Sequence, residues 1–130
     1  MPDPKLATTD AGREVIDHTA LEAIRSLQSD AAPRLLAQVV QIYFDSAPAL
    51  IEQLRVGMGA SNLTAIRAAA HSLKSSSANL GANTLAELCR MVELAARAGS
   101  IGPEVPGVPA IEREYDAVRR ALQLALEAMA

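Results

Sequence analysis

The sequence is poor in aromatic residues and in cysteine. Its 130 residues include no tryptophan and three aromatic side chains, Tyr43, Phe44 and Tyr115. Cys89 is the single cysteine, so neither an internal disulfide nor a cysteine-based metal cage can form. Two histidines without a cysteine pair also make a metal site unexpected. Strands favour aromatic and β-branched residues, whereas Ala, which supplies 26 residues here, favours helices. The composition therefore predicts an all-α fold.

The chain also lacks an excess of charge of one sign and any long apolar run. The formal net charge is −3 and both signs are mixed along the chain, so there is no basic stripe for nucleic acid. No apolar run approaches the ~20 residues that span a bilayer, and the first residues lack the pattern of a signal peptide. No glycine-rich nucleotide loop is present. We expect a cytoplasmic protein with no cofactor and no direct membrane contact.

The spacing of apolar residues divides the chain into a tail and one domain. Residues 1–16 contain two prolines, a glycine and a polar Thr-Thr-Asp run, which predict a linker or flexible tail. Residues 17–130 contain one short and four long stretches with apolar residues three and four apart. Short connections join the long stretches. This pattern predicts an antiparallel four-helix bundle with a short additional N-terminal helix.

The helix signals give more specific expectations. Asp17 or Thr19 is a candidate cap for the first helix, Asp30 for the second, and Ser61 or Asn62 for the third. The stripe of the second helix keeps its phase across Pro48, which predicts one long kinked helix. Gly81 and Gly99 should end the next two helices. The expected core stripes are Leu36, Val40, Tyr43, Ala47, Leu50, Leu54 and Met58; Leu63, Ile66, Ala70, Leu73, Ser77 and Leu80; Leu85, Leu88, Val92 and Ala95, with Cys89 beside them; and Ile111, Tyr115, Val118, Leu122, Ala125 and Met129.

The most informative segment surrounds His71. On a helix, His71 lies at the edge of the apolar stripe, with Arg67 one turn before it and Lys74 one turn after. An imidazole is nucleophilic near neutral pH, and phosphoryl transfer needs mainly an in-line approach and positive charge. Lys74 and, second, Arg67 are the candidate phosphate-stabilising residues, because a mid-helix histidine has no free backbone N–H groups nearby. The small residues at positions 68, 75 and 78 (Ala68, Ser75 and Ala78) leave room for a partner.

Position and charge alone leave the role of this histidine open, because a lone histidine on a helix is most often an ordinary surface residue. His18, the other histidine, is interpreted as a surface or cap residue. Cys89 is interpreted as a small buried hydrophobic residue.

The flanking residues make the interpretation more specific. The segment resembles the signature of histidine-containing phosphotransfer (HPt) domains, His-x-Leu-Lys-Gly-Ser-Ser followed by a glycine ten residues after the histidine. One position departs from it, Ser75, where the family usually has glycine; serine is small enough to keep access open, and its hydroxyl could hydrogen-bond the imidazole or a phosphate. The resemblance covers roughly residues 17–129, including family-like runs at 44–48 and 85–90. The matching residues are His71, Leu73, Lys74, Ser76, Ser77 and Gly81.

The resemblance implies a function. HPt domains are four-helix bundles without kinase activity that carry phosphate between receiver domains of response regulators, so His71 would be phosphorylated and then pass the group to an aspartate. In the family, a Gln or Glu on the next helix often hydrogen-bonds the histidine, which here corresponds to Glu93. Counted from Gly81, His71 and Glu93 lie at heights that differ by ~3 Å. Expected partners are receiver domains and a hybrid sensor histidine kinase, of which a chain with a linker-like start could be the C-terminal part. We expect a monomer.

A histidine kinase core and a non-catalytic interaction bundle are the two alternative classes of protein. A histidine kinase core also carries a helical histidine, but there an acidic residue and then a proline typically follow, whereas Ser72 follows here and the next proline is Pro103. A non-catalytic interaction bundle would leave His71 incidental, against the dense matching around it. For docking, we expect an apolar patch around His71 to which the first helix contributes Ile24 or Leu27.

Overall fold

The computed structural model describes residues 7–9 and 13–129. Two short strands, β1 (Ala7–Thr9) and β2 (Arg13–Ile16), pair antiparallel and precede a short helix, α1 (His18–Arg25). Four long helices follow: α2 (Leu35–Gly59), α3 (Leu63–Asn79), α4 (Asn83–Ala98) and α5 (Val108–Met129). The predicted all-α bundle with an additional N-terminal helix is therefore confirmed, with a small hairpin added to it.

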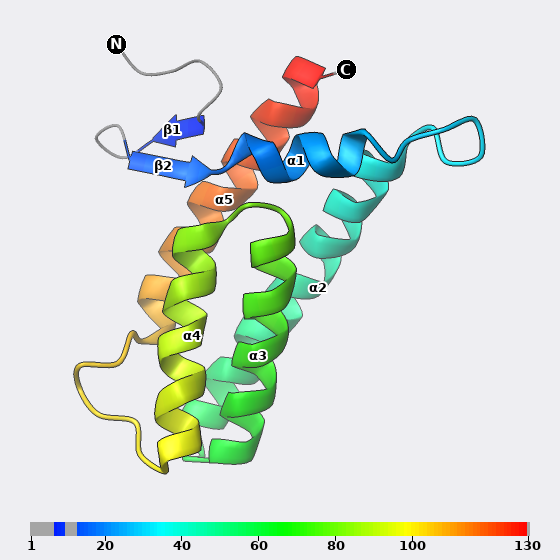
Figure 1. The fold of residues 1–130 in the computed structure, drawn as a ribbon. Coiled ribbons are helices and arrows are strands. Elements are labelled where there is room, and N and C mark those ends of the chain that lie inside the picture. Colours follow the sequence, from blue (N-terminus) through cyan, green and yellow to red (C-terminus); the bar gives the residue numbers. More distant parts are fainter. Residues whose placement is uncertain (1–6, 10–12, 130) are drawn as a thin grey trace.

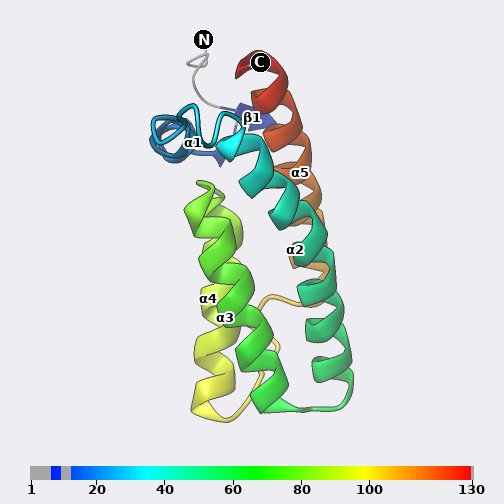
Figure 2. The same ribbon diagram turned by 90° about the vertical axis from the view of Figure 1, so that its right-hand side faces the viewer.

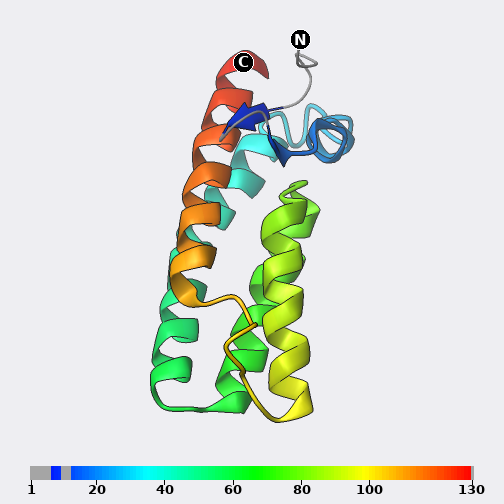
Figure 3. The same ribbon diagram turned by 90° about the vertical axis from the view of Figure 1, so that its left-hand side faces the viewer.

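The four long helices form an antiparallel bundle in which each contacts two neighbours. The α3–α4 hairpin lies on one side and the α2–α5 pair on the other, as Figures 2 and 3 show from opposite directions. α1 runs across the end of the bundle where the α3–α4 turn lies (Figure 1). No helix in the described ranges is long and apolar enough to cross a membrane.

The core follows the predicted stripes, with small rotations of the helices. In α2 the buried face runs as predicted to Ala47 and then continues through Ile51 instead of Leu50. In α4 Cys89 is fully buried within the core, while Leu88 is only half-buried. These shifts arise because 3.6 residues per turn lets either of two adjacent residues point inward. Tyr43 and Tyr115 pack together in the centre, with ring centroids 5.8 Å apart.

The ends of the helices show which capping signals were correct. Asp17 accepts a hydrogen bond from the Thr19 N–H, and Asn62 accepts one from the Ala65 N–H. The Asp30 cap was wrong: α2 begins at Leu35, and the Gln28 side chain accepts the N–H of Leu36 instead. Pro48 lies inside α2, which is continuous through it as predicted. Gly99 ends α4 in a left-handed conformation, φ +99°.

The N-terminal segment changes the expected domain boundary. Val15 and Ile16 of β2 are buried in the core of the bundle, so residues 13–16 are part of the folded unit and not of a linker. Residues 1–6 and 10–12 of the expected tail lie outside the described residues. The Asp17 N–H donates to the carbonyl of Gly81 at 2.9 Å, which joins the start of α1 to the α3–α4 turn. Sequence periodicity missed the strands because they are only three and four residues long.

Candidate functional site

His71 projects from the middle of α3 toward solvent. Asn62 caps this helix, and its buried face includes Ala70 and Leu73, which flank the position of His71. Because successive residues differ by about 100° around a helix, the side chain after Ala70 turns away from the core. The His71 side chain is 57% exposed. It is therefore open to a partner while its helix is fixed by packing.

Glu93 of α4 lies beside the imidazole and is almost completely covered, with 4% of its side chain exposed. One carboxylate oxygen, Oε2, lies 2.8 Å from Nδ1 of His71. The other oxygen, Oε1, accepts a hydrogen bond from Nζ of Lys74 at 2.5 Å. The predicted contact between Glu93 and the histidine ring is thus present. The hydrogen bond from Lys74 lowers the pKa of Glu93 below its usual value, against the effect of burial, and the bond from His71 adds to this.

The ionised carboxylate determines how the imidazole is protonated. A carboxylate only accepts hydrogen bonds, so Nδ1 of His71 must carry the proton that is shared with Glu93. In the neutral ring, Nε2 then holds the free lone pair. Among the hydrogen bonds and ion pairs of the described residues, none involves Nε2 of His71. This arrangement presents a neutral nitrogen nucleophile at the surface of the bundle.

The cations around His71 differ in whether they form an ion pair with a carboxylate. Lys74 is tied to Glu93, whereas Arg67, which is exposed on α3, has no acidic partner in the described part of the chain. A third cation, Arg97, places Nη2 3.6 Å from Oε2 of Glu93 and was missed from the sequence. The signal that could have found it is its position four residues after Glu93, where two helical side chains are neighbours.

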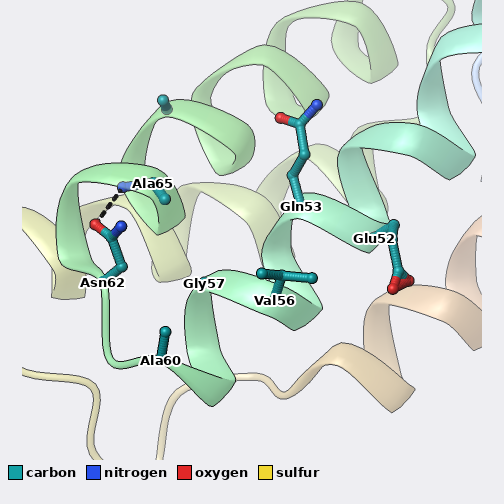
Figure 4. Close-up of a pocket in the computed structure, with 8 residues that line it drawn as sticks. Glu52, Gln53, Val56, Gly57, Ala60, Asn62 and Ala65 are labelled. Carbon is teal, nitrogen blue, oxygen red and sulfur yellow. Dashed lines mark hydrogen bonds between the residues drawn. The ribbon is translucent and has the colours of Figure 1, made fainter.

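The predicted small residues surround His71 as expected from helix geometry. Ala68, Ser75 and Ala78 are all exposed on α3. Among the hydrogen bonds of the described residues, none joins the Ser75 hydroxyl to the imidazole. Ala68 also belongs to a groove of about 350 Å³ between α2 and α3, shown in Figure 4, where Val56 and Gln53 of α2 lie near Ala65 of α3. Because these side chains are small, they leave the exposed side of α3 sterically accessible.

The two residues expected to dock a partner have different environments. Ile24 is half-buried and packs against the core, whereas Leu27, just beyond the end of α1, is 69% exposed. Both belong to the segment at the α3–α4 turn end of the bundle (Figure 1). Of the two, Leu27 is the one available to a partner.

Comparisons with known proteins agree with this fold. Residues 38–121 match the family model of the Hpt domain, so the chain belongs to that family. Hpt domains are phosphocarriers of two-component phosphorelays, in which they interact with receiver domains and histidine kinases. The crystal structure of histidine-containing phosphotransfer protein B from Pseudomonas aeruginosa PAO1 has a similar fold, with a TM-score of 0.71 and 26% sequence identity. The similarity covers 88% of this chain and 96% of that chain. Comparison with curated proteins gave no match.

Proposed function

We propose that this chain carries a phosphoryl group on His71, which it accepts from the aspartyl phosphate of one receiver domain and passes to the aspartate of another. The observation that carries the proposal is the hydrogen bond of 2.8 Å between Nδ1 of His71 and the covered carboxylate of Glu93. It holds the ring in one orientation and leaves Nε2 as the nucleophile. Neighbouring small side chains give a partner access to that atom.

The transfer needs little chemistry from this chain. Nε2 of His71 attacks phosphorus, the P–O bond to the aspartyl carboxylate breaks, and the carboxylate leaves with the electron pair. The imidazole becomes a phosphorylated imidazolium whose Nδ1 proton stays on the hydrogen bond to Glu93. The carboxylate thereby stabilises the positive charge that develops on the ring. The reverse reaction, with a second aspartate as nucleophile, returns Glu93 and His71 to their starting state.

The charged residues near His71 have distinct proposed roles. Lys74 neutralises Glu93 and keeps that carboxylate ionised, since it gives Oε1 a hydrogen bond at 2.5 Å. Lys74 also adds positive charge beside the incoming phosphoryl group, as does Arg67 from the preceding turn of α3. Ala68, Ser75 and Ala78 keep the approach open. Ile24 and Leu27 are proposed to extend the docking surface toward α1, with Leu27 making the direct contact.

The proposed partners follow from the same chemistry. Donor and acceptor are receiver domains, and the donor receiver belongs to a hybrid sensor histidine kinase. We propose that the chain acts in the cytoplasm as a monomer. It has no proposed metal or cofactor of its own, because the receiver supplies the acid–base and metal chemistry.

The test is phosphoryl transfer from a receiver domain that carries a radioactive aspartyl phosphate. We expect acid-labile label on the wild-type chain and on a His18→Gln variant, but none on His71→Gln. His18→Gln is the matched control because it removes the other histidine, whose side chain lies at the start of α1. Label that persists on His71→Gln would refute the proposal. Incubation with ATP alone should label none of the three chains.

A further inference from the structure

The carboxylate of Glu93 is shared unequally among its neighbours. Oε1 is occupied by Lys74, while Oε2 faces both Nδ1 of His71 at 2.8 Å and Nη2 of Arg97 at 3.6 Å. Since the last two distances share the atom Oε2, the guanidinium nitrogen lies at most 6.4 Å from the imidazole nitrogen. Arg97 is therefore a neighbour of the reacting ring although it comes from a different helix.

The charges around Glu93 do not balance. Lys74 already compensates the carboxylate through a short contact, so the positive charge of Arg97 is in excess while His71 is neutral. The separation of 3.6 Å exceeds an ordinary N–H···O hydrogen bond, and 53% of the Arg97 side chain is exposed. An ion pair of this kind contributes little to stability. The Arg97 guanidinium can therefore turn to a better acceptor at small cost.

Arg90 offers a contrast on the same side of α4. It lies seven residues before Arg97, two turns of helix away, and its exposure is similar. However, two hydrogen bonds, of 2.7 and 2.5 Å, tie its guanidinium to Glu87. Position on the helix alone does not distinguish the two arginines, but their bonding does.

We propose that Arg97 is a phosphoryl-binding residue, which turns from Glu93 to the phosphoryl oxygens when His71 is phosphorylated. This inference rests on the proposed function, because it requires a phosphoryl group on His71. A phosphoryl group carries more negative charge than one carboxylate and offers three strong acceptor oxygens. The planar guanidinium matches two of them at once, which an ammonium such as that of Lys74 cannot do. Arg97 thus holds the group from the α4 side, opposite the cations of α3.

The experiment uses phosphoramidate, a small phosphoryl donor that needs no partner protein, and follows phosphohistidine by phosphorus NMR as the pH is changed. The charged side chains of α3 and α4 in this region are Arg67, Lys74, Glu87, Arg90, Glu93 and Arg97. A cation bound to the phosphoryl group favours its doubly ionised form. We expect Arg97→Gln to raise the pKa of the phosphoryl group by about half a unit. Arg97→Lys should recover part of the shift, and Arg90→Gln should match the wild type.

A second measurement is the occupancy of His71 at equilibrium with a phosphorylated receiver domain. Arg97→Gln should lower the equilibrium constant for phosphohistidine formation about threefold, and added salt should reduce this difference. If Arg97→Gln matches Arg90→Gln in both measurements while His71 is still labelled, the inference is wrong and the proposed function stands. If neither donor labels His71 in the wild type, the proposed function fails and the inference fails with it.

Discussion

Gly81→Ala should destabilise the fold in two ways, through backbone strain and through steric clash with the N-terminal segment. The φ of Gly81 is +78°, in the left-handed region that side chains rarely adopt. A Cβ atom there would lie 2.4 Å from the carbonyl oxygen of Asp17 and 3.1 Å from the Cβ of Ala20. The same residue accepts the Asp17 N–H at 2.9 Å. Gly81→Ala therefore disturbs both the α3–α4 turn and the segment that packs on it.

The expected loss of stability has three parts. The left-handed conformation costs about 1 kcal/mol for an alanine. Loss of the hydrogen bond from Asp17 costs about 1 kcal/mol, and the displacement of packed backbone costs at least another 1 kcal/mol. The free energy of unfolding should fall by about 3 kcal/mol, which corresponds to a decrease in Tm of about 10 °C for a chain of this size. Urea unfolding followed by helical circular dichroism measures it.

Gly99 provides the matched control. Its φ is +99°, but a Cβ atom there would have no heavy atom within 4 Å. Gly99→Ala should therefore show the conformational cost alone, about 1 kcal/mol. If Gly81→Ala is no more destabilising than Gly99→Ala, the contact between Gly81 and Asp17 does not fix the N-terminal segment, and the reasoning is refuted.

Three further predictions concern the site and the core. Glu93→Gln should lower the free energy of unfolding at pH 7 by about 1 to 2 kcal/mol through loss of the charged hydrogen bond to Lys74. Because the pKa of Glu93 is lowered in the folded protein, the difference in stability from wild type should be present above the usual carboxyl pKa and should vanish as the pH falls through the lowered pKa. A stability difference that is unchanged between pH 7 and pH 3 would contradict this. Leu27→Asp, at an exposed position, should slow transfer from a receiver domain and leave labelling by phosphoramidate unchanged; equal slowing of both reactions would place its effect outside docking. Tyr43→Phe should cost about 1 to 2 kcal/mol because it leaves the buried Ser77 hydroxyl without its 2.9 Å partner, and adding Ser77→Ala should recover part of that loss, which urea titrations of both variants would measure.

Much of the fold could be predicted from the sequence because helical periodicity is a local signal. The apolar spacing gave the four long helices and the continuity of α2 through Pro48, since each residue of a stripe depends only on its neighbours along the helix. The predicted buried faces differ from the observed ones by one position in α2, where Ile51 is buried instead of Leu50, and in α4, where Leu88 is only half-buried although Cys89 is buried as predicted. Which of two adjacent residues points inward depends on the neighbouring helix, and this information is not local.

The β1–β2 hairpin is a part of the fold that the sequence did not predict. Val15 and Ile16 are buried by contact with the bundle, and no periodicity can be read in strands of three and four residues. The Asp30 cap failed for a related reason, because Gln28, a residue without a capping pattern, satisfies the N–H of Leu36. Both features depend on how the chain turns between helices.

The site likewise contains residues that the sequence could predict and one that it could not. His71 and the residues around it belong to one helix, so their relation could be derived from helix geometry. Glu93 was indicated by the resemblance to HPt domains, and counting residues on both sides of Gly81 agreed with that assignment, because the two helices leave the turn side by side. Arg97 was missed because its importance depends on which neighbours Glu93 already binds. The spacing within α4 could indicate the pair of Arg97 and Glu93, but that Lys74 of α3 already binds Glu93 depends on the packing of two helices.

The region around His71 is positively charged although the whole chain is negatively charged, and this difference affects which partner state binds. The chain has a formal net charge of −3, yet Arg67, Lys74 and Arg97 outnumber the single carboxylate of Glu93 near a neutral His71. Because a phosphorylated receiver is more negative than an unphosphorylated one, this positive region favours its approach. In the proposed transfer, the negative charge of a phosphoryl group on His71 offsets the surrounding cations, and the attraction to the spent receiver falls. In the proposed function, the charged side chains around His71 would thus also favour release of the donor after transfer.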